Sequence, residues 1–150
     1  MTDKVMIDTN VLVYSYDTAD SAKQQRALDT LQYLTLHNRG ALSTQVLAEF
    51  FVTATRKISP PLSIVDAATR IEHLLQVWTI FDVTAAVTLE AVRGVRRYQF
   101  SFWDAQIWAV ARLNQVPIVL SEDFNSGATI EGVQFINPFA MTTPVETWLP

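Results

Sequence analysis

The sequence predicts an α/β protein, a three-layer α/β/α sandwich around a mainly parallel sheet of four to five strands. Short apolar, β-branched runs alternate with helix-length segments along the whole chain, which is typical of strands joined by crossover helices. The runs are apolar at consecutive positions, as in strands that helices cover on both faces. The chain has 150 residues, the length of one domain, and we expect residues 1–150 to form a single domain.

Five segments rich in apolar and β-branched residues are predicted strands, the last of them a short edge strand. They are residues 5–7, 40–43, 78–81, 117–120 and 133–136. The segments between them have helical periodicity, and Asp20 is a predicted N-cap. The helices are predicted at residues 11–16, 21–38, 44–56, 63–77, 84–98 and 102–114.

The composition argues against several classes of protein. An apolar fraction of 49% with 16 aromatic residues excludes intrinsic disorder. The longest apolar run, Ile107 to Ala111, is far shorter than a membrane span, so no membrane association is expected. Asp8 and Asn10 interrupt any signal peptide, and the chain has no cysteine. We therefore expect a cytoplasmic protein.

The net charge of −4 comes from fifteen acidic and eleven basic side chains. An acidic protein is unsuited to broad electrostatic binding of nucleic acid. A local site where bound cations reverse the sign of the field remains compatible with this charge. Only four glycines occur, so the sequence has no glycine-rich phosphate loop.

Acidic residues follow most of the predicted strands, at the sheet edge where ligands bind in α/β proteins. Asp8, Asp82, Glu122 and Asp123 come at or just after strand ends, and the second strand leads into the helix that carries Glu49. Asp8 is equally well placed to be a helix N-cap. Position alone does not separate Glu122 from Asp123, and it leaves Asp82 open.

Two further carboxylates lie within predicted helices. Glu49 is at the margin of an apolar stripe, where glutamates are usually solvated. Asp104 is on a helix that is apolar almost all round, and a buried carboxylate needs a partner, a proton or a metal. Ser101 and Asp104 also match a capping box, but the apolar surroundings favour a functional role for Asp104.

Carboxylates that converge at one sheet edge repel one another and raise each other's pKa values. A hard divalent cation relieves this repulsion, and all-oxygen ligation without His or Cys favours Mg²⁺ or Mn²⁺. Such ions activate water and stabilise a phosphoryl oxygen during displacement. The chemistry predicted from these residues is metal-assisted hydrolysis of phosphodiester bonds.

Four segments resemble the PIN-domain nucleases, and most closely the VapC-like ribonuclease toxins of bacterial toxin–antitoxin pairs. The resemblance runs in order from about residue 4 to residue 139, and the order and spacing of the four motifs make it specific. The segments are Val5-Met6-Ile7-Asp8-Thr9-Asn10-Val11-Leu12, Leu47-Ala48-Glu49-Phe50, Phe102-Trp103-Asp104-Ala105-Gln106-Ile107 and Leu120-Ser121-Glu122-Asp123.

This resemblance implies an endoribonuclease, the toxin of a type II pair, that binds Mg²⁺ or Mn²⁺. It also implies a homodimer, and inhibition by an antitoxin whose C-terminal segment occupies the toxin groove. The family pattern leaves out Asp82 and selects Asp123 rather than Glu122. The acidic positions that match the family's metal ligands are Asp8, Glu49, Asp104 and Asp123, with Asn10 and Ser121 as supporting polar residues.

Arg93, Arg96 and Arg97 cluster shortly before the helix of Asp104. They are candidates to contact RNA phosphates or an acidic antitoxin residue. The simpler interpretation, slightly favoured, is that cations near a helix C-terminus complement its dipole. Three tryptophans are interpreted as core residues rather than as platforms for base stacking: Trp78, Trp103 and Trp108.

Two other functions remain open from the sequence. One is a phosphatase of the haloacid-dehalogenase type with Asp8 as its nucleophile, although the second Asp expected two residues later is Asn10 here. The other is a non-catalytic binding module in which the acidic pocket holds a partner or a structural ion. Retention of the whole acidic set argues against the binding module.

Overall fold

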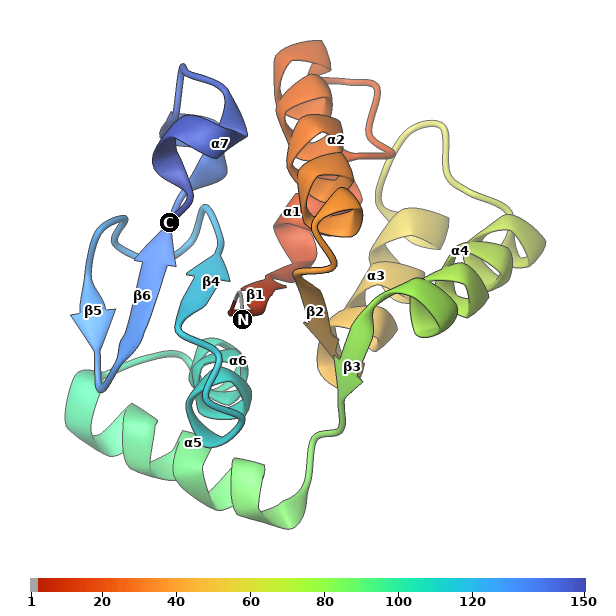
Figure 1. The fold of residues 1–150 in the computed structure, drawn as a ribbon. Helices are drawn as coiled ribbons and strands as arrows, with labels where there is room; N and C mark the ends of the chain where they lie inside the picture. The colour runs from red at the N-terminus through yellow and green to blue at the C-terminus, as the bar shows by residue number, and fades with distance from the viewer. Residues whose placement is uncertain (1–2) are drawn as a thin grey trace.

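The computed structural model describes residues 3–150 and contains a six-stranded sheet with helices on both faces (Figure 1). The strands are β1 (Val5–Ile7), β2 (Gly40–Ser43), β3 (Thr79–Phe81), β4 (Ile118–Leu120), β5 (Thr129–Ile130) and β6 (Val133–Ile136). Their order across the sheet is β3-β2-β1-β4-β6-β5. Every neighbouring pair is parallel except β5 and β6.

The strand order reverses beside β1. The chain proceeds from β1 to β2 and β3 on one side, then returns to place β4 on the other. Val5 is in register with Gly40 of β2 and with Ile118 of β4. In a parallel sheet, the carboxyl ends of the two strands at such a reversal enclose a crevice, and ligands bind there.

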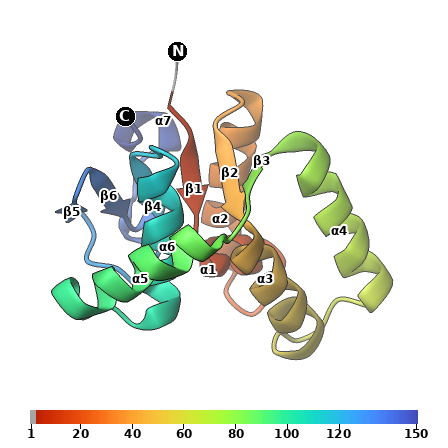
Figure 2. The same ribbon diagram turned by 90° about the horizontal axis from the view of Figure 1, so that it is seen from below.

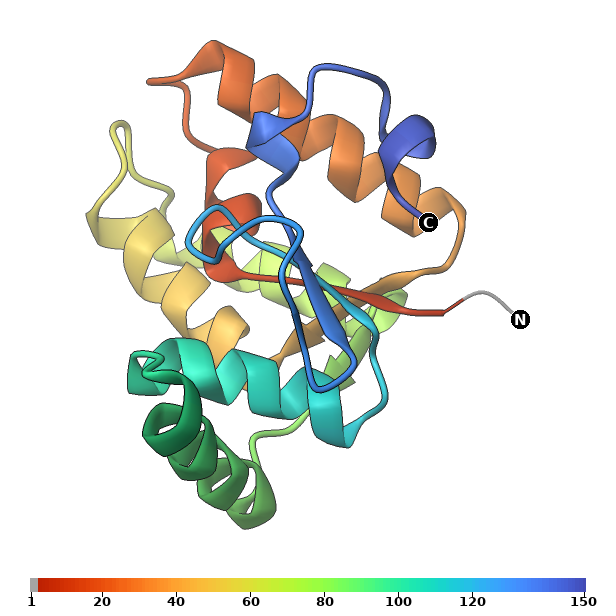
Figure 3. The ribbon, with the colours of Figure 1, turned by 90° about the vertical axis from the view of Figure 1, so that its left-hand side faces the viewer.

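The helices form the outer layers. Helices α2 and α7 cover one face of the sheet, α5 and α6 cover the other (Figures 1 and 3), and α4 lies beyond the β3 edge (Figure 2). Their bounds are α1 Thr9–Tyr14, α2 Ser21–Leu36, α3 Thr44–Arg56, α4 Ile64–Val77, α5 Ala85–Tyr98, α6 Phe102–Leu113 and α7 Val145–Trp148, with a 3-10 helix, η1, at Pro138–Ala140.

Side-chain caps fix where most of these helices begin. At each cap, a hydroxyl or carboxylate oxygen accepts a hydrogen bond from the backbone N–H three residues later, which satisfies a donor that the first turn leaves free. The capping residues of α2 to α6 are Asp20, Ser43, Ser63, Thr84 and Ser101.

The core lies between the sheet and its helices, and Trp108 and Phe50 are among its largest fully buried side chains. Trp108 also explains a glycine in the neighbouring helix. A Cβ atom on Gly94 of α5 would lie 2.8 Å from the Trp108 ring of α6. The close packing of α5 on α6 therefore requires a residue without a side chain at this position.

The predicted fold class, the parallel sheet and all five predicted strands are confirmed. The predicted strand count was one short, because β5 has only two residues. The first helix begins at Thr9 rather than Val11, since Asp8 caps it by accepting a hydrogen bond from the Thr9 N–H. Within residues 3–150, no helix combines the length and apolarity that a membrane crossing requires.

Candidate active site

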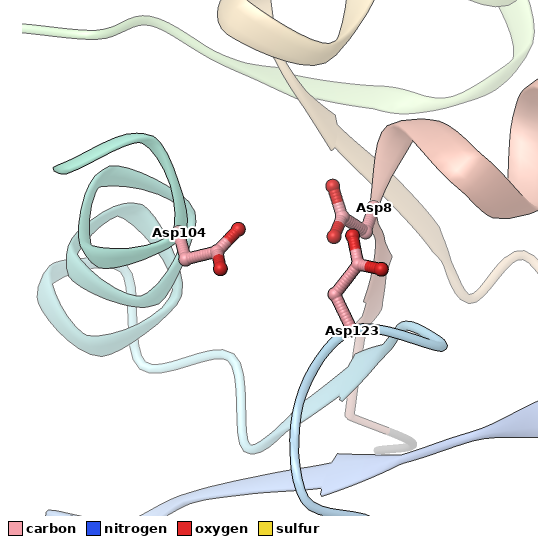
Figure 4. A group of neighbouring side chains, drawn as sticks. All are labelled: Asp8, Asp104 and Asp123. Carbon is pink, nitrogen blue, oxygen red and sulfur yellow. The ribbon is translucent and has the colours of Figure 1, made fainter. Parts of the chain in front are cut away.

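Three aspartates converge at the crevice between β1 and β4. Asp8 follows β1, Asp123 lies in the loop after β4, and Asp104 projects from the first turn of α6 toward both (Figure 4). One carboxylate oxygen from each lies within 4.8 Å of the other two. The reversal in strand order therefore brings together residues that are far apart in the sequence.

Asp8 is the buried member of this acidic cluster, with 4% of its surface exposed. Its Oδ1 atom accepts a hydrogen bond from the Thr9 backbone N–H at 2.7 Å. Its Oδ2 atom accepts one from the Ser121 hydroxyl at 2.8 Å and one from the Asn10 amide at 3.4 Å. Asp8 is thus both the cap of α1 and a member of the cluster, so its role as a cap is compatible with a role in the site.

Two neutral side chains, Asn10 and Ser121, form hydrogen bonds with the acidic cluster. The Asn10 amide donates to Asp123 at 3.2 Å and to the Ser121 hydroxyl oxygen at 3.3 Å. The Ser121 hydroxyl oxygen also accepts from the Asp123 N–H at 3.0 Å. Because neither Asn10 nor Ser121 carries a charge, they fix the carboxylates in place without neutralising them.

The surroundings disfavour negative charge on the cluster. Burial raises the pKa of Asp8 to about 7, and hydrogen bonds from Ser121 and the Thr9 N–H only partly oppose this. Burial also raises the pKa of Asp104, which is half-buried, and the charges of Asp123 and Glu49 raise it further against a hydrogen bond with Ser101. Mutual repulsion and desolvation therefore act in the same direction.

Glu49 lies at the rim of the site, outside the group of three. Its carboxylate accepts hydrogen bonds from the Thr9 hydroxyl at 2.6 Å and the Gln45 amide at 2.7 Å. Sequence reasoning missed Thr9 and Gln45 as partners. Their spacing was the available signal, because Thr9 directly follows Asp8 and Gln45 is four residues before Glu49 on one helix face.

The two acidic residues that the sequence left open lie outside the group of three. Glu122 accepts a hydrogen bond from the Tyr14 hydroxyl at 2.9 Å and forms an ion pair with Lys23 at 2.9 Å. Asp82 is exposed and follows β3, two strands away from β1. Of Asp82, Glu122 and Asp123, only Asp123 belongs to the group of three.

The three arginines lie on α5 and differ in their surroundings. Arg93 pairs with Glu90 and with Glu131, the latter at 2.8 Å, so its charge is used within the fold. Arg96 and Arg97 are exposed in the last turn of α5. The helix-dipole interpretation fits Arg96 and Arg97 in particular.

One tryptophan differs from its prediction as a core residue. Trp78 and Trp108 are buried as predicted, whereas 61% of Trp103 is exposed. The reason is its position in the first turn of α6, because that turn extends beyond the core and only residues 105–111 of the helix are fully buried. Apolar periodicity identified the helix correctly but not the point at which it leaves the core.

The donor set of the acidic cluster fits a hard divalent cation. All three ligand groups are carboxylates, and no Lys, Arg or His within the described residues forms an ion pair with them. Oxygen donors of this kind match Mg²⁺ and Mn²⁺ better than Zn²⁺. The arrangement can therefore hold a cation that supplies the missing positive charge.

Comparison with known proteins gives one family and several similar structures. A family model described as the PIN domain matches residues 5–126. No curated protein matches the chain by sequence.

Similar solved structures include a bacterial toxin and toxin–antitoxin complexes. A toxin–antitoxin complex from Klebsiella pneumoniae is 19% identical with a TM-score of 0.66, over 90% of this chain and 98% of that one. The sarcin-ricin loop cleaving toxin VapC20 of Mycobacterium tuberculosis is 20% identical with a TM-score of 0.64, over 85% and 98%. VapBC2 of Rickettsia felis, bound to a promoter DNA fragment, is 18% identical with a TM-score of 0.61, over 89% and 97%. At these identities the likeness establishes a shared fold.

Proposed function

Because this chain belongs to the PIN domain family, we propose that it is a Mg²⁺- or Mn²⁺-dependent endoribonuclease and the toxin of a type II toxin–antitoxin pair. One observation carries the proposal: Asp8, Asp104 and Asp123 converge at the β1–β4 crevice without a counter-charge from the described residues. An organised set of uncompensated carboxylates costs folding free energy, so its presence indicates a functional site.

The proposed ligands of the cation are Asp8, Asp104 and Asp123, with Glu49 as the fourth acidic residue at the rim. When bound, the cation activates water and stabilises negative charge on a phosphoryl oxygen. Asn10 and Ser121 hold the carboxylates in position, as their hydrogen bonds to Asp8 and Asp123 support. Thr9 and Gln45 hold Glu49 in the same way.

Asp8 also couples cation binding to protonation. Burial raises its pKa to about 7, so the metal-free protein carries a proton on this carboxyl group over much of the acidic pH range. A carboxylate ligand must be deprotonated to bind a cation. Affinity for Mg²⁺ or Mn²⁺ is therefore expected to rise with pH up to about 7.

RNA is the proposed substrate, and an antitoxin protein is the proposed partner. The solved neighbours support both, since they include a sarcin-ricin loop cleaving toxin and toxin–antitoxin complexes. We propose that the chain acts as a cytoplasmic homodimer and that residues 1–150 form a single nuclease domain. Arg96 and Arg97, which form no ion pair among the described residues, are the proposed contacts to RNA phosphates or an acidic antitoxin residue, whereas the ion pairs of Arg93 favour a structural role.

The competing functions are less well supported. A haloacid-dehalogenase-type phosphatase would use Asp8 as nucleophile and needs a second carboxylate two residues later, where Asn10 donates hydrogen bonds instead. A binding module that holds an ion would have the same acidic cluster, so the cluster does not separate it from a nuclease. Membership of the PIN domain family favours the nuclease.

The decisive experiment incubates the purified protein, free of antitoxin, with total cellular RNA and Mn²⁺ or Mg²⁺. We expect discrete RNA fragments, and no cleavage when a chelator is added. Asp104→Asn should lower the cleavage rate by at least about a hundredfold, since changes in residues that merely support metal ligands already cost tenfold to a hundredfold. Calorimetric titration with Mn²⁺ should show binding by the wild type and weaker binding by the variant.

Glu72→Gln is a matched control, because Glu72 is an exposed glutamate of α4 with no ion pair among the described residues. It should cleave RNA as the wild type does. Intact RNA in the presence of Mn²⁺ would contradict the proposal. Phosphate release from a monoester would then favour the phosphatase, and Mn²⁺ binding without any hydrolysis would favour the binding module.

A further inference from the structure

An exposed indole ring lies beside the acidic cluster. Trp103 directly precedes Asp104 in the first turn of α6, and 61% of its surface is exposed. It lines a cavity of about 560 Å³ whose other walls include Thr44 and Ala48 of α3 and Val83 after β3. Glu49 lines the same cavity, so the cavity is continuous with the rim of the candidate active site.

Two buried glutamines connect this cavity to the site. The Gln106 amide donates to Gln45 Oε1 at 2.8 Å, and the Gln45 amide donates to Glu49 Oε1 and to the Trp103 carbonyl oxygen. This chain of hydrogen bonds fixes both amide groups. Gln106 lines the cavity, and its Oε1 accepts no hydrogen bond from residues 3–150, so this oxygen is the candidate acceptor for a ligand there.

We propose that this cavity is a nucleobase subsite, in which a base flanking the cleaved phosphodiester stacks on Trp103 and donates an exocyclic amino hydrogen to Gln106 Oε1. The inference rests on the proposed ribonuclease function. A base suits the cavity because it is flat and uncharged, so the carboxylate of Glu49 does not repel it. The phosphates of the same strand then extend toward the cation held by Asp8, Asp104 and Asp123.

The two contacts of the subsite together predict a base preference. Stacking on an aromatic ring tolerates every base, whereas a free acceptor favours adenine, cytosine and guanine, which carry an amino group, over uracil. The protein should therefore bind oligo(A) and oligo(C) more tightly than oligo(U). Gln106 is the specificity-determining residue in this scheme, whereas Trp103 binds any base and takes no part in the chemical step.

Cleavage kinetics test the role of Trp103. Trp103→Ala should raise KM for RNA about tenfold, the typical loss when a stacking ring is removed, and should change kcat by less than about threefold. Trp103→Phe should restore most of the KM, because a smaller aromatic ring still stacks. Val65→Ala is the matched control, since Val65 is an exposed apolar residue of α4 outside this cavity and should leave KM unchanged.

Fluorescence anisotropy of labelled oligo(A), oligo(C) and oligo(U) gives a second readout, with Ca²⁺ in place of Mn²⁺ and the integrity of the RNA checked on a gel. Equal affinity for the three oligonucleotides would overturn the role of Gln106. Unchanged KM and RNA affinity in Trp103→Ala would overturn the subsite. If that variant instead bound only the antitoxin peptide more weakly, the cavity would be a protein-binding pocket.

The two proposals fail in distinguishable ways. If the wild type leaves RNA intact with Mn²⁺, the ribonuclease proposal fails, whatever the behaviour of Trp103→Ala. If the wild type cleaves RNA and Trp103→Ala cleaves it with the same KM, only the subsite fails. Circular dichroism of Trp103→Ala checks that its fold is intact, as its exposure leads us to expect.

Discussion

Two acidic regions of the molecule differ in their counter-charges. Where α5, α6 and the turn from β5 to β6 come together, glutamates form ion pairs with arginines. At the carboxyl ends of β1 and β4, three aspartates form no ion pair with the described residues. In the first region, Glu90 pairs with Arg93 and with Arg112 at 2.6 Å. Glu131 pairs with Arg93 at 2.8 Å and with Arg112 at 3.3 Å. These interactions tie the turn to the two helices.

The acidic cluster has the opposite electrostatics. Asp8 is almost completely buried, and its hydrogen-bond donors within the site are neutral groups. The pKa of Asp8 is raised to about 7, whereas hydrogen bonds from Arg93 and Tyr98 lower the pKa of Glu131 to about 2. The contrast separates carboxylates that stabilise the fold from carboxylates whose proposed role is to bind a cation.

Asp8→Asn should produce the largest effect, an increase in the free energy of unfolding of the metal-free protein at neutral pH. The folded-state pKa of Asp8 is about 7 against an ordinary value of 3.8, so the folded protein keeps a proton that the unfolded chain loses above about pH 4. Wild-type stability therefore falls as pH rises toward 7, by a few kcal/mol at about 1.4 kcal/mol per pKa unit. Asn cannot titrate and should abolish this loss.

Urea unfolding in a chelator, at about pH 4 and about pH 8, measures the effect. The readout is the difference in the free energy of unfolding between the two pH values. A single value would not suffice, because Asn also replaces an acceptor of the Ser121 and Asn10 hydrogen bonds with a donor, which affects stability at both pH values. Asp123→Asn is the matched control, since Asp123 is exposed and should show a smaller change. If wild type and Asp8→Asn depended on pH in the same way, Asp8 would not be the strained member of the cluster.

Glu131→Gln should have a smaller effect of the opposite sign. The pKa of Glu131 is about 2, below its ordinary 4.5, so its contribution to stability is present above about pH 4.5 and disappears as pH falls toward 2. At neutral pH we expect a loss of at most about 1 kcal/mol, as for other solvent-accessible ion pairs. Urea unfolding at low and high salt measures this loss.

High salt should reduce the loss in Glu131→Gln, because salt screens accessible charges. RNA cleavage should stay at the wild-type rate, since Glu131 lies outside the acidic cluster. Glu72→Gln, without an ion pair, should not change stability. A loss of cleavage in Glu131→Gln would show that the two regions are coupled and that the comparison between them does not hold.

The strands, which the structure confirms, and the acidic residues of the candidate site were both predicted from local features of the sequence. Asp8 was found because it follows a strand, and Asp104 because a carboxylate stands out on an apolar helix. The two-residue strand β5 was not predictable by periodicity, because it depends on a tight turn at Glu131 and Gly132 with φ values of 49° and 84°. Such a turn is usually recognised by Asn-Gly rather than Glu-Gly.

Contacts between side chains that are far apart in the sequence could not be predicted from the sequence. Glu122 and Asp123 are adjacent, and the family resemblance was needed to choose between them. In the structure the two residues differ because Glu122 forms an ion pair with Lys23, a residue 99 positions earlier in the chain. The exposure of Trp103 was unpredictable for a similar reason, because the position at which α6 leaves the core depends on the layers packed around it.

The contrast between compensated and uncompensated carboxylates recurs within this adjacent pair and leads to the smallest predicted effect. Both Glu122 oxygens are bound, one by the Tyr14 hydroxyl and one by Lys23. Glu122→Gln should therefore change RNA cleavage by less than about twofold, and stability by only a few tenths of a kcal/mol, as for an accessible pair. Asp123→Asn should reduce cleavage strongly, because Asp123 belongs to the cluster. Parallel RNA cleavage assays of the two variants test this assignment of Asp123, rather than Glu122, to the active site. If Asp123→Asn cleaved RNA like the wild type and Glu122→Gln did not, the assignment would be reversed. The ion pair of Glu122 with Lys23 would then be part of the active site.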